Sequence, residues 1–208
     1  MSLEAEITEG LAATGMDLPE AASSRFAAYL RLIAKWNRVH NLTAVRETSQ
    51  MVIVHLLDSL SVLPHLASAR TIVDVGSGAG LPGIPIAIAR PEAQITLLEA
   101  SHKKCAFLQQ AKTELGLANV TVVCERVEHW RPQQRFEAVV SRALSELAEF
   151  VDQAQHLLAP GGRLIAMKGV YPYEELAKVP ATHRVSQVLE LRVPKLEAKR
   201  HLIFLEPA

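Results

Sequence analysis

A glycine-rich segment behind a short apolar run carries the clearest chemical signal in this chain. Residues 72–75 are apolar except for Asp74, a pattern typical of a short strand that is buried on both faces of a parallel sheet. Four glycines follow within eight residues, at positions 76, 78, 80 and 83. Such glycines turn the chain sharply and let backbone N–H groups approach a ligand, because no Cβ is in the way. The segment alone fits NAD, FAD, S-adenosylmethionine or a purely structural turn.

A carboxylate at the end of the next apolar run narrows this choice. Residues 95–99 read Ile-Thr-Leu-Leu-Glu, so Glu99 ends a second strand shortly after the loop. An acidic side chain there accepts hydrogen bonds from ribose hydroxyls in nucleoside-binding α/β folds. Asp74 stands directly before the loop, where it could orient an amino group of the cofactor or, alternatively, cap the loop or the next helix. The glycine segment and Glu99 together predict a nucleoside-cofactor site.

Two zones of different periodicity must position these residues. Residues 1–66 read as helical, with one helix that opens after Pro19 and ends within 36–43, and another whose apolar stripe stops near Pro64. From about residue 71 strands and helices alternate. We expect strands at 71–75, 95–99, 120–124, 136–141, 163–168, 186–193 and 201–206, and helices at 83–90, 101–115, 144–158 and 173–178. Because residues 194–200 are too few for a crossover helix, the last two strands must form a hairpin, which makes the final strand antiparallel.

This arrangement resembles the class I S-adenosylmethionine-dependent methyltransferases, an α/β fold of Rossmann-like type. The expected sheet has seven mostly parallel strands with an antiparallel last strand, and an N-terminal helical extension precedes it. A dinucleotide-binding dehydrogenase would usually have six parallel strands and no terminal hairpin, and the sequence offers no candidate for hydride transfer. We expect one compact unit, in which a helical extension over residues 1–66 packs on a Rossmann-like methyltransferase domain over 67–208.

Composition sets further limits. The chain has 208 residues, of which 49% are hydrophobic and 21% charged, and its formal net charge is zero, so any nucleic-acid contact needs a local basic patch. We expect no membrane span, because no run of about eighteen apolar residues occurs. The acidic N-terminus and the two cysteines, Cys105 and Cys124, favour a cytoplasmic protein without a secretory signal or disulfide. No metal site is expected, since no His/Cys/Asp cluster shows ligand spacing.

Six short motifs in one order extend the resemblance from about residue 36 to the end of the chain. They are Asn-Leu-Thr-Ala at 41–44, His-Leu-Leu-Asp-Ser at 55–59, the glycine segment ending Leu-Pro-Gly-Ile-Pro at 81–85, Ser-Arg-Ala at 141–143, Lys-Gly at 168–169 and Arg-His-Leu at 200–202. Together they resemble the bacterial small-subunit ribosomal RNA guanine-N7 methyltransferases, also called the glucose-inhibited division protein B family. The resemblance implies methyl transfer from S-adenosylmethionine to N7 of a guanine in the decoding-region loop of 16S ribosomal RNA, as free RNA or in the small ribosomal subunit.

The same resemblance implies a set of cofactor contacts. Gly76, Ser77, Gly78 and Leu81, with Asp74, would surround the methionine part of S-adenosylmethionine, Glu99 would bind its ribose, and Val127 and Glu128 would border its adenine. On residue type alone, Glu128 fits a solvated loop acid better, so its assignment depends mostly on the resemblance.

Two basic residues at strand ends are the candidates for the reacting centre. Arg142 follows the fourth strand and Lys168 ends the fifth, and open α/β sheets place their crevice at these ends. Guanine N7 carries a lone pair and no proton, so no general base is expected. Arg142 is expected to contact both the cofactor and guanine O6, which would position N7. Lys168 is the weaker candidate, since a lysine there also fits a snorkelling surface role.

RNA contacts are expected from residues of the helical zone and the last hairpin: Arg38, Asn41, His55, Asp58, Lys199 and Arg200. For each a structural alternative stands beside the functional one. His55 fits a core histidine, Asn41 a capping residue and the charged side chains a solvated surface.

Other activities are less consistent with the chain. Exocyclic-amine methyltransferases carry an Asn/Asp-Pro-Pro-Tyr run where this chain has Ser-Arg-Ala, and neither cysteine lies where a cytosine-C5 enzyme needs its nucleophile. A small-molecule methyltransferase with the same cofactor site, and a non-catalytic cofactor- or RNA-binding protein, remain the alternatives.

Overall fold

A computed structural model of the chain describes residues 2–142 and 146–208. Its centre is one seven-stranded sheet with the order β3-β2-β1-β4-β5-β7-β6. The strands are β1 (Thr71–Val75), β2 (Gln94–Glu99), β3 (Val120–Cys124), β4 (Phe136–Ser141), β5 (Leu158–Lys168), β6 (His183–Leu191) and β7 (Arg200–Pro207). β1 to β5 pair in parallel, and β7 lies antiparallel between β5 and β6. The expected sheet and its closing hairpin are confirmed.

Two strands begin more than one residue earlier than their patterns predict: β6 starts at His183 rather than at 186, and the larger difference is in β5. β5 starts at Leu158 rather than at 163, because the register with β4 shifts between the pairs Phe136–Leu158 and Ala138–Arg163. Residues 160–162 are accommodated in this irregularity, where Gly161 takes a φ of 74°. The Pro-Gly-Gly sequence at 160–162 therefore forms a bulge inside β5 and does not mark the start of the strand.

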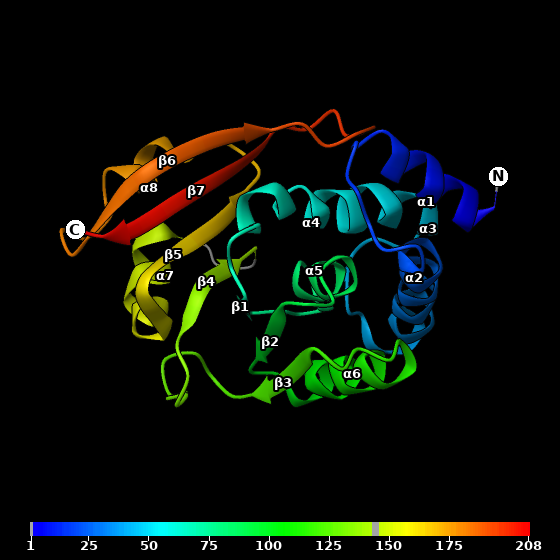
Figure 1. The fold of residues 1–208 in the computed structure, drawn as a ribbon, viewed down its shortest axis with the longest axis horizontal. Coiled ribbons are helices and arrows are strands. Elements are labelled where there is room, and N and C mark those ends of the chain that lie inside the picture. Colours follow the sequence, from blue (N-terminus) through cyan, green and yellow to red (C-terminus); the bar gives the residue numbers. More distant parts are fainter. Residues whose placement is uncertain (1, 143–145) are drawn as a thin grey trace.

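Helices cover both faces of the sheet. In Figure 1, α2, α4, α5 and α6 lie on one side of the strands, and α7 and α8 lie on the other. The α-helices are α1 (Leu3–Ala12), α2 (Ala22–His40), α3 (Thr48–Met51), α4 (Asp58–Leu60), α5 (Gly83–Ala89), α6 (His102–Glu114), α7 (Leu147–Ala154) and α8 (Tyr173–Leu176), with 3₁₀ turns η2 (Leu63–Leu66) and η3 (Gln155–Leu157). The helix expected over 144–158 is thus shorter, and its first two positions lie outside the described residues. None of the described helices is long and apolar enough to span a bilayer.

The second helix of the N-terminal zone departs from regular α geometry. A π-helical segment, η1 (Val52–Leu57), separates α3 from α4, and the N–H of Asp58 bonds the carbonyl of Ile53, five residues earlier. Periodicity predicted one continuous α-helix here, because an apolar stripe does not reveal a local change of helical pitch. Such π segments occur frequently at functional sites.

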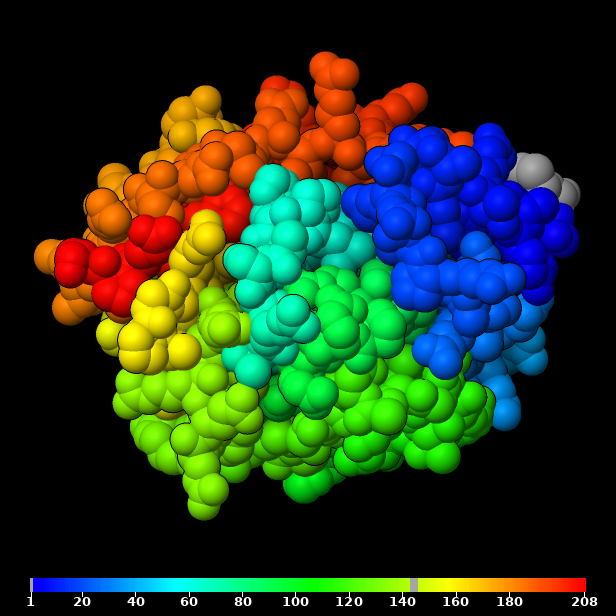
Figure 2. All heavy atoms as spheres, viewed as in Figure 1, coloured from blue at the N-terminus to red at the C-terminus, as the bar shows by residue number. Residues whose placement is uncertain are grey.

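The N-terminal helices share their core with the sheet. One cluster of buried side chains includes Phe26 and Leu30 of α2 together with Ile72 of β1 and Phe107 of α6. The space-filling view shows residues 2–66 packed closely against the central part of the chain on this face (Figure 2). A second cluster, on the α7 face, contains Phe150.

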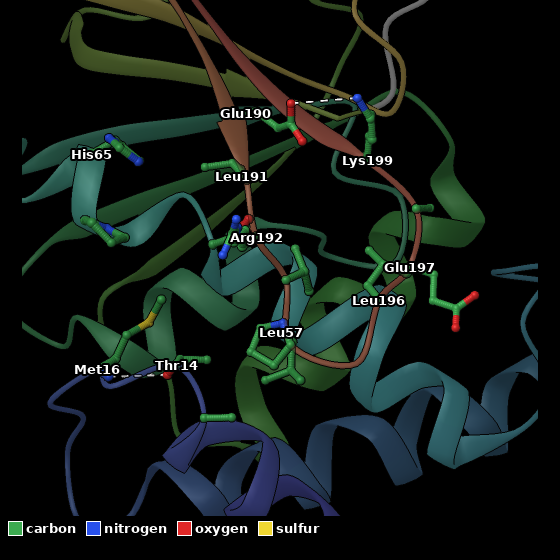
Figure 3. Close-up of a pocket in the computed structure, with 16 residues that line it drawn as sticks. Thr14, Met16, Leu57, His65, Glu190, Leu191, Arg192, Leu196, Glu197 and Lys199 are labelled. Atoms are coloured by element: carbon green, nitrogen blue, oxygen red, sulfur yellow. Dashed lines mark hydrogen bonds and ion pairs between the residues drawn. The ribbon is translucent and has the colours of Figure 1, made fainter.

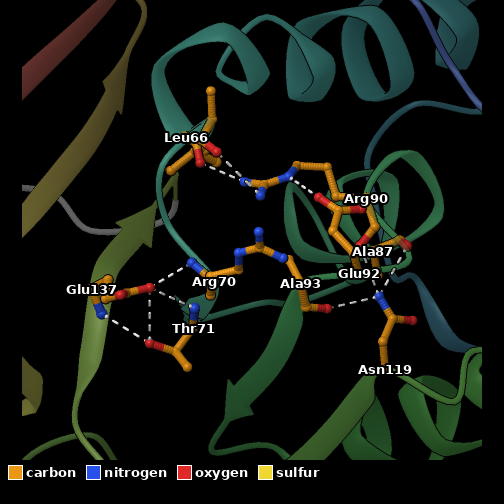
Figure 4. Close-up of polar contacts among 10 residues, drawn as sticks. Leu66, Arg70, Thr71, Ala87, Arg90, Glu92, Ala93, Asn119 and Glu137 are labelled. Carbon is orange, nitrogen blue, oxygen red and sulfur yellow. Dashed lines mark hydrogen bonds and ion pairs between the residues drawn. The ribbon is translucent and has the colours of Figure 1, made fainter.

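A layer of polar contacts fixes the amino ends of the strands, away from the glycine loop. Asn119, before β3, donates from Nδ2 to the carbonyls of Ala87, Arg90 and Ala93 at 3.0–3.1 Å (Figure 4). Nearby, Glu137 accepts from the backbone N–H of Thr71 at 3.1 Å. These contacts are structural and hold the loops that precede β2 and β3.

Candidate functional site

The glycine loop folds back over the end of β2. The N–H groups of Gly76 and Ser77 both donate to the carbonyl of Leu98, at 2.9 and 3.1 Å. The carboxylate of Glu99 accepts from Gly78 N at 2.8 Å and from Ser101 N at 2.9 Å. Gly76 and Gly78 have φ values of 71° and 58°, which favour glycine. Glu99 therefore fixes the loop. It is buried and does not itself line the cavity next to the loop, so its contact with a ribose stays a prediction.

A cavity of about 250 Å³ lies above this loop. Four residues that the sequence assigned to the methionine part of a cofactor line it: Gly76, Ser77, Gly78 and Leu81. The rest of the wall comes from Leu42, Thr43, His55, Ala79 and Arg142. Residues of the N-terminal zone, the glycine loop and the end of β4 thus form one cavity. A cofactor bound there would contact both zones of the chain.

Asp74 lies beneath the loop and not on its surface. It is fully buried, and its Oδ2 accepts from Gly83 N at 2.9 Å, the first residue of α5. This geometry matches the capping alternative, and the contact of Asp74 with a cofactor amino group stays a prediction. Burial raises the pKa of Asp74 to about 7, and its Oδ1 has no partner among the described residues. The side chain of Asp74 lies beside Leu97 and the start of α5.

The residues assigned to adenine lie apart from this cavity. Val127 is buried and belongs to the core on the α7 face, where Val75 and Leu98 also pack. Glu128 is half-exposed, and its carboxylate lies 3.7 Å from Nη1 of Arg126. The contacts of Val127 and Glu128 with a cofactor stay predictions.

A second cavity, of about 380 Å³, adjoins the first. His55 and Arg142 line both cavities, and Asp58, Lys168 and Arg200 line the second. Its remaining wall is formed by Val45, Val54, Met167 and Gly169. The two cavities therefore meet at His55 and Arg142. This junction lies in the crevice at the carboxyl ends of the parallel strands.

Arg142 is held at this junction by two acceptors. Its Nη1 donates to the carbonyl of Val54 and to Oδ2 of Asp58, both at 3.1 Å. Oδ1 of Asp58 accepts from Nε of Arg200 at 2.7 Å. The carboxylate of Asp58 is therefore buried between two guanidinium groups, a placement that favours a structural role over the expected RNA contact, which stays a prediction. Its partner Arg200 does face the cavity.

Lys168 is also held in place. Its Nζ lies 2.8 Å from Oε2 of Glu175, and its side chain is only 13% exposed. Glu175 in turn accepts from Leu147 N at 2.9 Å, which ties α8 to the start of α7. The ammonium group is therefore paired with a carboxylate and largely shielded from solvent, which does not fit the snorkelling alternative, and Lys168 contributes to the wall of the second cavity.

His55 is a buried, uncharged imidazole in the wall between the cavities. Burial and, second, the charge of Arg142 lower its pKa from 6.5 to about 4. Its Nε2 lies 2.8 Å from Oγ1 of Thr43. Nδ1 has no partner among the residues that the structure describes. His55 is accordingly neutral at pH 7.

Two residues that sequence reasoning missed support the cavity wall on the N-terminal side. Asn37 is buried, donates to the carbonyl of Val45 at 3.0 Å and accepts from Thr43 N at 3.0 Å, which fixes the chain that carries Thr43. Tyr29 donates from its hydroxyl to the carbonyl of Ala79 at 2.6 Å, a direct bond from α2 to the glycine loop. The only sequence signal for these residues was that each places a polar group within the apolar stripe of a helix.

The structure does not bring the other expected RNA residues to the cavities. Arg38 is exposed on α2, and Asn41 caps that helix with a φ of 47° while accepting from Arg46 at 2.8 Å. Lys199 points to the opposite side, where it lines a cavity of about 770 Å³ between the α1 end, η2 and the residues after β6 (Figure 3). That cavity is larger, but it contains none of the residues that the sequence assigned to the cofactor.

Comparison with known proteins gives a consistent result. The family model described as "GidB: rRNA small subunit methyltransferase G" matches residues 22–203. The chain is 54% identical to the "Ribosomal RNA small subunit methyltransferase G" of Nitrosospira multiformis, with 100% of this chain and 99% of that protein covered. It is 56% identical to the protein of the same name from Aromatoleum aromaticum, with 97% and 98% covered.

Solved structures share the fold at low sequence identity. The O-methyltransferase TomG of Streptomyces achromogenes, solved in complex with S-adenosylmethionine, covers 100% of both chains with a TM-score of 0.62 and 17% identity. A SAM-dependent methyltransferase from Aquifex aeolicus has a TM-score of 0.56 and 19% identity over 72% of this chain and 90% of its own. These likenesses place the sheet and its helices among methyltransferase folds.

Proposed function

Because the chain belongs to the GidB family of small-subunit ribosomal RNA methyltransferases, we propose that it methylates N7 of a guanine in 16S ribosomal RNA. The cofactor is S-adenosylmethionine, and the acceptor is a guanine of the decoding-region loop, in free RNA or in the small ribosomal subunit. We place the enzyme in the cytoplasm, where that RNA is assembled. The observation that carries the proposal is the meeting of two cavities at Arg142.

The two cavities suit the two reactants. The cavity of about 250 Å³ is floored by the backbone of residues 76–79, whose glycines leave room for the methionine part of a cofactor. S-adenosylmethionine supplies an electrophilic methyl group on a sulfonium sulfur. The adjoining cavity of about 380 Å³ is within the size range of small-ligand sites, about 300–1,000 Å³, and suits a base extruded from RNA.

The charges of the second cavity agree with an RNA acceptor. Arg142, Lys168 and Arg200 line it together with one carboxylate, Asp58, although the whole chain has no net charge. With Asp58 and Glu175, the partner of Lys168, counted as well, this cluster keeps one net positive charge, a local excess that supports attraction of a polyanion by a neutral chain. Backbone phosphates of the RNA would be attracted to the same rim.

Little acid–base chemistry is required of the protein. Guanine N7 carries no proton, so Arg142 needs only to donate a hydrogen bond to O6 on the same edge and leave N7 free. His55 is neutral and adds no charge beside the methyl group. Orientation of the two reactants at the junction then supplies most of the rate gain.

Transfer of a labelled methyl group from S-adenosylmethionine to purified 16S rRNA and to small subunits tests the proposal. We expect label in RNA, and 7-methylguanosine as the only labelled nucleoside after digestion. Label at another position of the base would reject the N7 assignment. Label on a small molecule but never on RNA would identify the enzyme as a small-molecule methyltransferase, and no turnover at all would favour a non-catalytic binding protein.

A further inference from the structure

Asp58 connects two guanidinium groups that come from distant parts of the chain. Its side chain is 4% exposed, and those of Arg142 and Arg200 are each 24% exposed. Arg142 follows β4, Arg200 begins β7 and Asp58 begins α4, so one carboxylate joins three elements at the rim of the second cavity. A buried carboxylate is stable only when it is paired and hydrogen-bonded, and here both oxygens accept from a cation.

The π-helical segment places this carboxylate. η1 ends at Leu57, and Asp58 N bonds the carbonyl of Ile53 instead of that of Val54. The carbonyl of Val54 accepts from Arg142 at 3.1 Å. A regular α-helix would direct the N–H of Asp58 to Val54, so the change of pitch frees one acceptor for Arg142 and aims the carboxylate at the same guanidinium.

The charges explain why a carboxylate is needed between these groups. Without Asp58, the guanidinium groups of Arg142 and Arg200 would carry like charges on one small cavity that Lys168 also lines. Repulsion would then move the less constrained group away. With Asp58 present, Arg142 is fixed by two acceptors at a place where it lines both cavities.

We propose that Asp58 is a positioning residue: it does not contact RNA, but holds Arg142 at the methyl-transfer junction and couples it to Arg200. The inference rests on the proposed function, since Arg142 must act on the acceptor base for its position to matter. Asp58 therefore affects the rate of transfer and leaves the binding of S-adenosylmethionine nearly unchanged.

The test is Asp58→Asn, which keeps the shape of the side chain and removes its charge. We expect kcat, at saturating S-adenosylmethionine and 16S rRNA, to fall by about tenfold to 100-fold, as for a small displacement of an aligned group. The dissociation constant for S-adenosylmethionine, measured by calorimetry, should change by less than about twofold. An unchanged kcat in a folded Asp58→Asn protein would overturn the inference and leave the proposed function standing, whereas an inactive wild-type enzyme would overturn both.

A matched control separates positioning from stability. Asn119→Asp makes the reverse isosteric change at a buried polar side chain whose three acceptors are carbonyls at the other end of the sheet (Figure 4). It should lower Tm because a carboxylate then faces these carbonyls, and the folded fraction should keep the wild-type kcat. If Asn119→Asp lowers kcat as much as Asp58→Asn does, the effect of Asp58 is one of general stability and the inference fails.

The double variant Asp58→Asn/Arg200→Gln gives a second readout. Removing the charge of Arg200 relieves the repulsion on Arg142, so the double variant should recover several-fold in kcat over Asp58→Asn alone. Strictly multiplicative losses would show that Arg142 and Arg200 are not coupled through Asp58, and would also overturn the inference.

Discussion

Arg142 combines a fixed position with access to both cavities. Two acceptors from one helical segment, the Val54 carbonyl and the Asp58 carboxylate, engage its Nη1. A side chain held in this way loses little freedom when a substrate arrives, which is the basis of preorganised catalysis. The planar guanidinium also offers several donors in a fixed geometry, which an ammonium group cannot reproduce.

Replacing Arg142 should therefore impair transfer more than folding. Arg142→Ala should lower kcat by at least about 100-fold at saturating cofactor and RNA, because base and methyl group are no longer aligned. Arg142→Lys should recover only a small part of the rate, since it keeps the charge without the fork. Initial rates with labelled S-adenosylmethionine check this, and circular dichroism confirms the fold. Recovery of wild-type rates in Arg142→Ala by added cofactor would instead assign the residue to cofactor binding.

His55 makes the stability of the protein depend on pH. Its folded pKa, about 4, is below its ordinary value of 6.5, mainly because of burial. Its contribution to the free energy of unfolding is therefore complete above about pH 6.5 and is lost as the pH falls toward 4. The slope approaches about 1.4 kcal/mol per pH unit for one proton. Asp74, whose raised pKa is about 7, acts in the opposite direction: it stabilises the fold most below pH 4, and this is lost as the pH rises through 7.

Comparison with His55→Gln isolates the histidine from Asp74. Urea unfolding of both proteins between pH 4 and 7 gives the difference in free energy of unfolding, wild type minus variant, in which the contribution of Asp74 cancels. This difference should decrease as the pH falls from about 6.5 toward 4. Parallel curves for the two proteins would show that His55 is not the buried neutral group described here.

At the scale of elements, the glycine loop can be tested with a matched pair. Gly78 and Gly116 have φ values of 58° and 62°, and a Cβ at either would meet no atom closer than 3.8 Å. Gly78→Ala and Gly116→Ala should therefore cost similar stability, about 1–2 kcal/mol of left-handed strain each. Only Gly78 lines the cofactor cavity, so only Gly78→Ala should weaken S-adenosylmethionine binding, by about tenfold or more. Equal affinity in the two variants, by calorimetry, would remove the loop from the cofactor site.

The bond between α2 and the loop predicts that the N-terminal helices support cofactor binding. Tyr29 is fully buried, and its hydroxyl is the donor to Ala79 O at 2.6 Å. Tyr29→Phe leaves that carbonyl without its donor, which should cost about 1–3 kcal/mol of stability and loosen the loop. S-adenosylmethionine affinity should fall several-fold. A Tyr29→Phe protein that loses stability but binds the cofactor as the wild type does would show that α2 acts only through packing.

Sequence periodicity predicted the regular elements because their signals are local. The strands β1, β3 and β4 begin and end where apolar runs do, and the short last connection alone required the hairpin. The π segment η1 and the bulge in β5 were missed, because tertiary packing and not residue type sets them. For the same reason Arg142 could be predicted from its place at a strand end, while the pairing of Asp58 with Arg200, 142 residues away, could not.

At the scale of the whole molecule, the two zones of the sequence form one site. Thr43 and His55 belong to residues 1–66, and the glycine loop belongs to residues 67–208, yet all of them line the same cavity. Buried side chains of the two zones also belong to one hydrophobic core. We propose that the helical extension is a working part of the methyltransferase and not an independent domain, since one wall of both cavities depends on it.

A crystal structure with S-adenosylhomocysteine, the product of methyl transfer, tests the central claim most directly. We predict that its sulfur lies in the cavity of about 250 Å³ and faces Arg142, with both ribose hydroxyls within hydrogen-bond distance of Glu99. Product bound in the cavity of about 770 Å³ near Lys199, or a ribose that does not reach Glu99, would contradict the site described here.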